Sequence, residues 1–224
     1  MNNYNYKKDI LKRINTKKLC ISVIGLGYVG LPLSLLLSKK FRVIGIDINK
    51  KKMNDLHSGK SYIERIDNRK IKIFNKKNIF STEFSRIKES DFIIICVPTP
   101  LTKNGSPDLS FIRDAITKIK PYLKQGQVIV LESTSYPGTT FDHIVKVLNT
   151  RFKIGKNFFV GFSPERIDPG RNENKIQKIP KVVSGNTSNC LEIISKFYES
   201  NFDKVFKSES ILIAEFSKLL ENVY

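Results

Sequence analysis

Residues 19–47 read LCISVIGLGYVGLPLSLLLSKKFRVIGID, and this stretch decides the expected fold. Its first six residues are apolar and mostly β-branched, which is typical of a strand buried on both faces. A glycine turn follows over residues 25–30, and residues 29–40 have the length and pattern of a helix. Residues 41–46 form a second apolar run. This order of strand, turn, helix and strand predicts one unit of a parallel α/β sheet.

The turn has the spacing G-x-G-x-x-G, formed by Gly25, Gly27 and Gly30. The first glycine permits a tight turn, the second lets the backbone approach a pyrophosphate, and the third lets the helix pack on the sheet. The helix then offers N–H groups and a partial positive charge to phosphate. The motif predicts a dinucleotide site lined also by Tyr28 and Val29. The alternative is a glycine turn that serves only packing.

Asp47 ends the second predicted strand, about 20 residues after the first glycine, where the motif places an acidic residue. A carboxylate there accepts hydrogen bonds from the ribose hydroxyls and repels a 2′-phosphate. NAD is therefore predicted as the cofactor rather than NADP. The neighbouring Lys50, Lys51 and Lys52 weaken this charge argument slightly, and Lys52 is itself among the predicted cofactor-binding residues.

Strand and helix patterns alternate along the chain to about residue 206. This alternation predicts a doubly wound, mainly parallel sheet. Further strands are expected over residues 91–97, 128–131, 158–162, 182–184 and 205–206, and helices over residues 50–58, 108–123, 139–152, 188–199 and 210–224. Asp108 is the expected N-cap of its helix. Residues 61–77 are charged and ambiguous.

Length and composition exclude several classes of protein. The chain has 224 residues, of which 40% are hydrophobic and 27% charged, so it is expected to be globular rather than disordered. No apolar run approaches the roughly 20 residues of a membrane span. Residues 1–18 lack the apolar core of a secretory signal, and three widely spaced cysteines suit neither a disulfide framework nor a zinc site. We expect a cytoplasmic protein with no metal and no membrane partner.

The net charge of +18, from 39 Lys+Arg against 21 Asp+Glu, allows a polyanionic partner. The lysines occur in short, dispersed clusters, however, and form no basic stripe interleaved with aromatic residues. A nucleic-acid-binding protein is therefore an alternative interpretation, but we expect no nucleic-acid partner.

Ligands of open α/β sheets lie outside the carboxyl ends of the strands. Residues 98–100, 132–134 and 163–165 each follow a predicted buried strand directly, and each brings polar groups. Thr99, Thr134 and Glu165 in these segments are therefore candidate site residues.

Five motifs occur in one order: GLGYVGLPL, VPTPL, LESTSYPGTT, FSPERIDPG and AEFSKLLENVY. Together they resemble the UDP-glucose/GDP-mannose dehydrogenase family, and most closely its UDP-N-acetylglucosamine 6-dehydrogenase branch. The resemblance runs from about residue 18 through nearly the whole chain. It implies NAD-dependent oxidation of the C6 alcohol of a UDP-sugar to the uronic acid, through two hydride transfers, in surface polysaccharide biosynthesis.

The resemblance implies roles for four residues. Thr134 and Glu165 would lie near the nicotinamide and the reacting carbon, where they would position water and move protons. Lys218 and Asn222 match a lysine and an asparagine of the family's central helix, and their spacing places them on one helix face. The ammonium would stabilise an oxyanion and the asparagine would add a hydrogen bond. Alternatively, these residues satisfy a strand end, a surface ion pair and an ordinary helix surface.

The family completes its second oxidation with a cysteine in a glycine-rich stretch beyond the central helix, and no such stretch occurs here. Cys190 lacks that context and is not given the role. We therefore expect an N-terminal portion that binds NAD and turns over little or nothing. Its parts are a basic arm, loose or forming a short helix (residues 1–18), a Rossmann-like NAD-binding domain (residues 19–207) and the start of a central connecting helix (residues 208–224), without the UDP-binding domain.

In the family, the full-length protein forms a homodimer through the central helix, so the same is expected here. The apolar face of residues 210–224 would then be exposed in this chain, and it is formed by Ile211, Leu212, Phe216, Leu219 and Leu220. The alternative function is a non-catalytic module that senses a dinucleotide.

Overall fold

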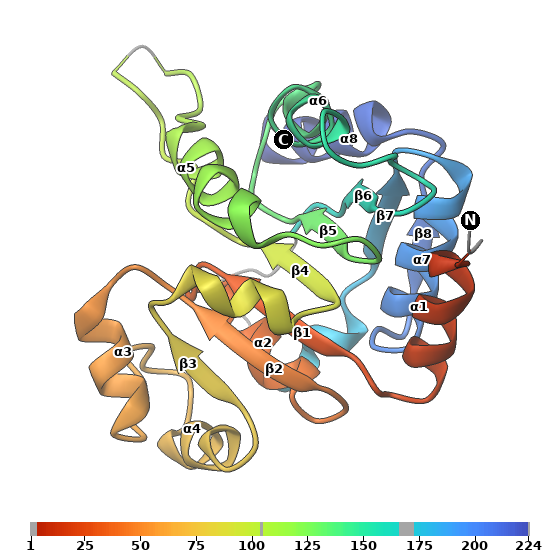
Figure 1. Ribbon diagram of the computed structural model, residues 1–224. Helices are drawn as coiled ribbons and strands as arrows, with labels where there is room; N and C mark the ends of the chain where they lie inside the picture. Colours follow the sequence, from red (N-terminus) through yellow and green to blue (C-terminus); the bar gives the residue numbers. More distant parts are fainter. Residues whose placement is uncertain (1–3, 104, 166–172, 224) are drawn as a thin grey trace.

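The computed structural model describes residues 4–103, 105–165 and 173–223. Within these residues, eight strands form one sheet in the order β3-β2-β1-β4-β5-β6-β7-β8 (Figure 1). Every neighbouring pair is parallel except β6 and β7, which are antiparallel. The predicted doubly wound, mainly parallel sheet is therefore confirmed. The strands are β1 (Cys20–Ile24), β2 (Arg42–Ile46), β3 (Ile79–Ser81), β4 (Phe92–Ile95), β5 (Val128–Leu131), β6 (Phe159–Phe162), β7 (Lys181–Gly185) and β8 (Val205–Lys207).

Helices cover both faces of the sheet (Figure 1). Successive side chains of a strand point to opposite faces, so each apolar run supplies two cores. In β4, Phe92 and Ile94 join one core, and Ile93 and Ile95 join the other. The first core is covered by α1 (Tyr6–Asn15), α2 (Gly30–Leu37), α3 (Lys50–His57), α4 (Asn68–Asn75) and α7 (Ser188–Glu199). The second is covered by a 3₁₀ turn (Phe84–Glu89), α5 (Ser110–Ile119), a π-helical turn (Phe141–Val145), α6 (Lys146–Asn149) and α8 (Ile211–Val223).

The N-terminal segment is a packed helix rather than a loose arm. The Asn5 side chain caps α1 by accepting from the Lys8 backbone N–H. Ile10 and Ile14 are buried in the core, and α1 lies against α7. Arg13 makes a bidentate contact of 2.6 and 2.7 Å with Asp91. Ile10 and Ile14, spaced i and i+4, thus lie on one face of α1 and pack this otherwise basic segment onto the domain.

Several helix boundaries differ from the prediction. The helix expected over residues 108–123 ends at Ile119, and a 3₁₀ turn (Lys120–Tyr122) follows because Pro121 has no N–H to continue the helical bonds. Asp108 lies one residue before the N-cap, Leu109, and its carboxylate accepts from the Ser110 N–H at 2.8 Å. The helix expected over residues 139–152 is a π-helical turn followed by α6. The ambiguous segment contains α4.

Helix α8 contacts β6 and β7 and leaves most of its apolar face uncovered. Leu212, Phe216, Leu219 and Leu220 are exposed, as expected. Ile211 is half-buried instead, because it packs against the second core. Of the described helices, none is both long and apolar enough to span a membrane.

Candidate functional site

The glycine turn connects β1 to α2 and uses its three glycines differently. Gly25 has a φ of +89°, and a Cβ added there would lie 2.6 Å from the Cys96 carbonyl oxygen. A Cβ on Gly30 would lie 1.8 Å from the Gly25 oxygen. A Cβ on Gly27 would meet nothing within 4 Å. The first and third glycines are therefore required by packing, whereas the second faces open space that a phosphate can occupy.

Asp47 follows β2 and holds the glycine turn in place. Its Oδ2 accepts from the Leu26 N–H at 2.8 Å, and its Oδ1 accepts from the Asn49 N–H at 2.9 Å. The Lys52 Nζ lies 3.9 Å from Oδ2. This carboxylate is thus a structural acceptor as well as the predicted acceptor for ribose hydroxyls, and Lys52 moderates its charge.

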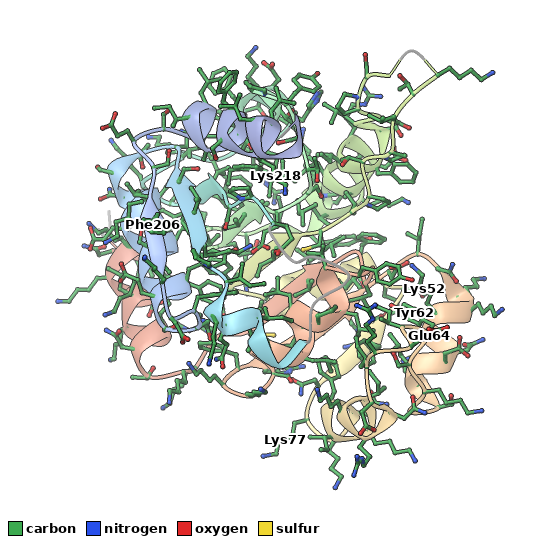
Figure 2. All side chains as sticks on the ribbon, turned by 180° about the vertical axis from the view of Figure 1, so that it is seen from behind. Lys52, Tyr62, Glu64, Lys77, Phe206 and Lys218 are labelled. Carbon is green, nitrogen blue, oxygen red and sulfur yellow. The ribbon has the colours of Figure 1, made fainter. Side chains whose placement is uncertain are left out.

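Tyr62 is a site residue that the sequence did not reveal. Its hydroxyl donates to the carbonyl oxygen of Leu26, the residue whose N–H donates to Asp47. The Lys52 Nζ lies 5.3 Å from the centre of its ring, and Figure 2 shows the two side chains together. Burial raises the pKa of Tyr62, so its phenol remains a donor. Tyr62 lies in the ambiguous segment, where no pattern singles it out.

A cleft of about 300 Å³ opens at the carboxyl ends of β1, β4, β5 and β6. It brings together most of the predicted cofactor residues: Gly25, Gly27, Tyr28, Val29, Asp47, Lys52, Thr99, Thr134 and Glu165. Gly30 is absent from its lining, because it packs against the turn itself. The lining also includes Cys96, Val97, Pro98, Glu132 and Ser133. Residues far apart in sequence therefore form one surface at the predicted edge of the sheet.

A second hollow adjoins the cleft and shares Asp47 and Lys52 with it. Its further lining residues are mostly apolar or aromatic: Ile48, Phe84, Phe111 and Ala115 among them. Ile48 lines this hollow and is 59% exposed. Such walls can hold a flat heteroaromatic base. Sequence reasoning missed this half of the site, because its residues come from separate loops and helices.

The four predicted catalytic residues are not all brought together. Thr134 is exposed after β5, and the Glu165 side chain after β6 is largely buried; both residues line the cleft. Lys218 is half-buried on α8 and does not line the cleft formed by the described residues; Figure 2 shows it far from Lys52 and Tyr62. Asn222 falls within α8, but its side chain lies outside the described part of the structure.

Glu132 and Glu165, which line the cleft, form a buried ionic cluster with Lys181. The Lys181 Nζ lies 2.7 Å from Glu132 Oε2 and 2.9 Å from Glu165 Oε2. Tyr198 donates to Glu132 Oε1. Burial raises the pKa of Glu132 to about 7, against the opposing effect of Lys181 and together with that of Glu165. Burial alone would lower the pKa of Lys181, but the two carboxylates outweigh it and raise that pKa.

Glu215 joins α8 to the loop that carries Thr134. Its buried carboxylate accepts from the Gly138 N–H at 2.7 Å and from the Thr140 N–H and hydroxyl at 2.9 and 2.7 Å. These donors lie at the start of the π-helical turn, where N–H groups lack partners within the helix. Burial raises the pKa of Glu215, and the hydrogen bonds oppose this shift. Neither Glu215 nor Lys181 was predicted, although each is a charge within a largely apolar segment.

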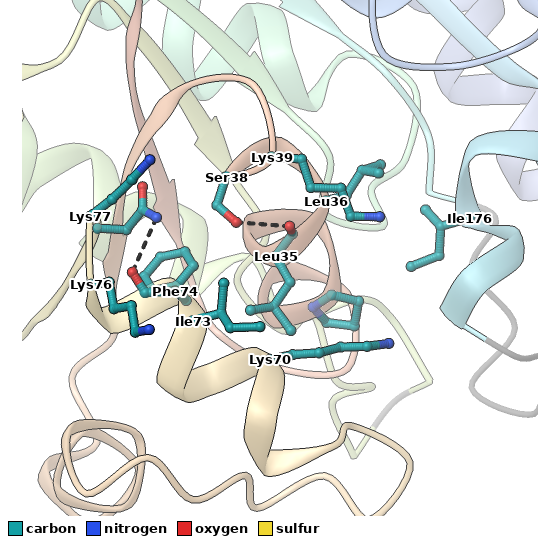
Figure 3. A pocket seen from close by; sticks show the side chains of 12 residues that line it. Leu35, Leu36, Ser38, Lys39, Lys70, Ile73, Phe74, Lys76, Lys77 and Ile176 are labelled. Atoms are coloured by element: carbon teal, nitrogen blue, oxygen red, sulfur yellow. Dashed lines mark hydrogen bonds between the residues drawn. The ribbon is translucent and has the colours of Figure 1, made fainter.

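Figure 3 shows a separate hollow between α2 and α4. It has apolar walls, including Leu35 and Phe74, and four lysines around it: Lys39, Lys70, Lys76 and Lys77. It lies along the carboxyl half of α2, beyond the glycine turn. It contains neither the open glycine nor a strand end, so it is distinct from the dinucleotide site.

Metal and thiol chemistry find little support in the described residues. Among them, no group of three or more His, Cys, Asp or Glu side chains could hold a metal ion. Cys20, Cys96 and Cys190 are free and buried. Cys190 lies inside α7 with no exposed surface, and the Thr187 hydroxyl lies 3.2 Å from its sulfur. A substrate therefore has no access to this thiol.

The chain resembles known proteins over one half of their length. It is 40% identical over 205 residues to protein CapL of Staphylococcus aureus, covering 90% of this chain and 48% of that protein. It is 36% identical over 206 residues to the UDP-N-acetyl-D-glucosamine 6-dehydrogenase of Salmonella typhi, covering 90% and 48% respectively. The chain thus spans about half the length of the curated relatives that it matches.

The solved structure of the UDP-N-acetyl-mannosamine dehydrogenase from Staphylococcus aureus superposes with a TM-score of 0.84 at 32% identity, covering 92% of this chain and 51% of that one. The family model for the NAD binding domain of the UDP-glucose/GDP-mannose dehydrogenase family matches residues 19–202. The match extends from β1 through α7 and includes the glycine turn, Asp47 and the strand ends that carry Thr134 and Glu165. The chain therefore belongs to the UDP-glucose/GDP-mannose dehydrogenase family and contains its NAD-binding domain.

Proposed function

We propose that this chain is the NAD-binding half of a UDP-N-acetylhexosamine 6-dehydrogenase that serves surface polysaccharide biosynthesis. The observation that carries the proposal is the continuous cleft from the open glycine and Asp47 to Thr134 and Glu165. The residues proposed to bind the cofactor and those proposed to transfer protons thus line the same cleft. The names of the Salmonella typhi and Staphylococcus aureus relatives support an N-acetylated UDP-sugar as substrate.

The residues present fit NAD. The Gly27 backbone and the amino end of α2 would receive the pyrophosphate, Asp47 would accept from a ribose hydroxyl, and the apolar hollow beside Ile48 would receive the adenine. The nicotinamide would then lie on the side of Thr134 and Glu165. When bound, NAD⁺ supplies the acceptor for the hydride.

Thr134 and Glu165 are proposed as the catalytic residues of this half. The Thr134 hydroxyl is exposed at the strand end and can orient the reacting alcohol or a water molecule. The Glu165 carboxyl can accept or hold a proton at the same wall. Lys218 and Asn222 are proposed to stabilise charge on the sugar oxygen from α8, with α8 closing over the substrate in the complete enzyme.

The remaining chemistry is assigned to a partner half. All three cysteines are buried, and Cys96, which lines the cleft, has a thiol pKa raised well above its usual value by burial. The thiol of the second oxidation and the groups that hold UDP are proposed to lie in the half of the relatives that this chain does not match. The exposed face of α8 is proposed to form a homodimer contact in the complete enzyme. Three buried free cysteines agree with a reducing compartment, and we place the enzyme in the cytoplasm.

Binding of NADH to residues 1–224, followed by its fluorescence, tests the cofactor assignment. We expect saturable binding, weaker binding of NADPH, and loss of binding in a Gly27→Val variant that melts like the wild type. A well-folded chain without NADH affinity would contradict the proposal.

A chimera tests the enzymatic assignment. Residues 1–224 would replace the matching half of the Salmonella typhi enzyme, and NADH formation from UDP-N-acetylglucosamine would be followed by absorbance. We expect turnover, with loss of turnover and retained NADH binding in Thr134→Ala and Glu165→Gln. A chimera that binds NADH and the UDP-sugar but makes no product would favour the non-catalytic sensing module instead.

A further inference from the structure

The hollow between α2 and α4 is a concave site whose lining residues have no role in the proposed function (Figure 3). It encloses about 340 Å³. Small-molecule pockets begin at roughly this volume, and a cavity of roughly 150 Å³ already holds benzene. The walls reach the core, since Leu35, Leu36 and Phe74 are 8%, 8% and 1% exposed. The hollow therefore has room for an apolar group of about two fused rings.

The outer wall of the hollow is an exposed apolar side chain. Ile73 lines it from α4 and is 65% exposed, whereas Ile71 and Phe74 of the same helix are buried. Ile73 thus lies off the face that packs α4 onto the domain. Its apolar surface is available to a ligand in the hollow, and covering it would contribute to binding.

The neutral polar side chains of the hollow already have partners within the fold. Ser38 Oγ donates to the Leu35 carbonyl oxygen at 2.8 Å, and Asn78 Nδ2 donates to the Phe74 carbonyl oxygen at 3.1 Å (dashed lines in Figure 3). Asn78 Oδ1 accepts from the Val43 N–H at 2.8 Å. The lysines are therefore the side chains that can meet the polar part of a ligand.

The charge around the hollow is of one sign. Lys39 lies on the α2 side and Lys76 and Lys77 on the α4 side (Figure 3), and all three are exposed. Among the described residues, none of these three lysines has a carboxylate within ion-pair distance, and no acidic residue lines the hollow. Lys70 also lines it but is engaged in another interaction, so it is left out of the count.

The helix ends offset only part of this charge. The three lysines follow the carboxyl ends of α2 and α4. Each such end has a partial charge of about −0.5, so the two helices balance about one of the three positive charges. An excess of about two positive charges remains at the rim. A phosphate group, with a charge of about −1.5 to −2 at neutral pH, matches that excess.

We propose that this hollow binds a small anionic amphiphile, which is a molecule with an apolar body of one or two rings, or a short alkyl chain, and a phosphate or carboxylate group. The body would lie between Leu35, Ile73 and Phe74, and the anion would lie among the three lysines. The ligand is a free small molecule rather than a bilayer, because the apolar walls are recessed between two helices. If the lysine stems only cover these walls, no such ligand binds.

The proposed site is independent of the dinucleotide site. It lies along the carboxyl half of α2, whereas the amino end of the same helix adjoins the glycine turn. The two sites have no lining residue in common. A ligand of the hollow therefore does not compete with NADH, and either site can be present without the other.

Amide NMR of the ¹⁵N-labelled 224-residue chain, titrated with 1-naphthyl phosphate, tests the site. We expect saturable shifts in residues 35–39 and 73–78 with a dissociation constant of about 1 mM or below. Inorganic phosphate and neutral 2-naphthalenemethanol should each bind about tenfold more weakly or worse, because each supplies only one part of the ligand. Shifts confined to residues 25–30 and 47–52, or equal binding of the intact probe and either part, would overturn the proposal.

Exposed variants separate the contributions of charge and wall. Lys76→Gln and Lys77→Gln should each weaken binding of 1-naphthyl phosphate by about two- to fivefold. Lys153→Gln, at an exposed lysine before β6, is the matched control and should change nothing. Ile73→Ser should weaken binding by about threefold or more without lowering the melting temperature. Its control is Ile213→Ser, at a residue of α8 that is 52% exposed. Affinity that is unchanged in all three hollow variants would contradict the site.

Vesicles distinguish a free ligand from a lipid headgroup. The chain would be sedimented with vesicles of phosphatidylglycerol at about 0.15 M salt, where surface charges are screened beyond about 8 Å. We expect the chain to remain in the supernatant. Sedimentation that Lys76→Gln and Lys77→Gln reduce, together with no binding of 1-naphthyl phosphate, would assign the lysines to a membrane surface and overturn the proposal.

Discussion

At the scale of single residues, the site depends on backbone positions as much as on side chains. Asp47 accepts a hydrogen bond from the Leu26 N–H, and Tyr62 donates one to the Leu26 carbonyl oxygen. The glycine turn is therefore fixed before a cofactor binds. Preorganised contacts of this kind lower the cost of binding a ligand. The glycines of the same turn permit a direct separation of folding from binding.

Gly27→Ala should lower the NADH affinity with little effect on stability, whereas Gly25→Ala should lower the stability of the fold. The alanine at 27 has room for its Cβ, so the melting temperature should stay near that of the wild type while the NADH affinity falls. The alanine at 25 meets the Cys96 oxygen and a φ of +89°, so it should cost about 1–3 kcal/mol of stability. Thermal unfolding and NADH titration check both. Equal losses of stability would contradict the assignment of Gly27 to the cofactor.

Asp47→Asn should weaken NADH binding about tenfold or more, because a charged acceptor for the ribose becomes neutral. NADPH should lose less affinity, since the repulsion of its extra phosphate falls. Calorimetry with both cofactors measures the ratio. Asp55→Asn on α3 is the control for net charge, because Asp55 lies outside the residues that line the cleft. An unchanged ratio would show that Asp47 only supports the turn.

At the scale of elements, the buried Glu215 carboxylate links α8 to the domain in addition to the packing of Ile211 and Ala214. The Glu215 carboxylate accepts three hydrogen bonds from the loop after β5, while Leu212, Phe216, Leu219 and Leu220 of α8 are exposed. These hydrogen bonds fix the position of α8 along the loop although several of its described apolar side chains are exposed. The position of Lys218 on that helix therefore depends on Glu215.

Glu215→Ala should release α8 and the loop that carries Thr134. We expect a loss of about 1–3 kcal/mol, as is usual when buried hydrogen bonds to a charged group are removed. Hydrogen exchange should rise in residues 134–141 and 211–220 and stay unchanged in β1 and β4. Glu209→Gln is the matched control, because Glu209 is exposed just before the same helix. Protection that is equal in both variants would contradict the anchoring role.

At the scale of the whole molecule, the sequence predicts the layers better than the contacts between them. The central strands are apolar runs with β-branched residues, so β1, β4 and β5 could be placed within a residue or two. The ends of the helices are predicted less accurately from the sequence. Pro121 ends α5 in a 3₁₀ turn, and residues 141–145 form a π-helical turn that the apolar pattern does not distinguish from an α-helix. Tyr62 and Glu215 lie 36 and 75 positions from the residues that they bind, and no local pattern encodes such pairs.

The stability of the whole domain should also report the protonation of Glu132. Its pKa is raised from 4.5 to about 7 in the folded state. The stability that this group contributes is therefore full below about pH 4.5 and is lost as the pH rises through about 7. Urea unfolding of Glu132→Gln against the wild type should show a difference that moves in favour of the variant from about pH 5 to about pH 8. A difference independent of pH would contradict the raised pKa.

The reversed direction of β7 has a consequence for how sites of this fold are searched. The last residues of β6 pair with the last residues of β7, Phe162 with Ser184 and Gly161 with Gly185. Continuing that register beyond the paired residues sets Lys181 opposite Glu165. A strand parallel to β6 would place its last residue at the carboxyl end of β6, whereas the antiparallel β7 places its first residue there. Where part of a sheet is inverted, as β7 and β8 are here, functional groups must therefore be sought at the first residues of the inverted strands as well as at the last residues of their neighbours.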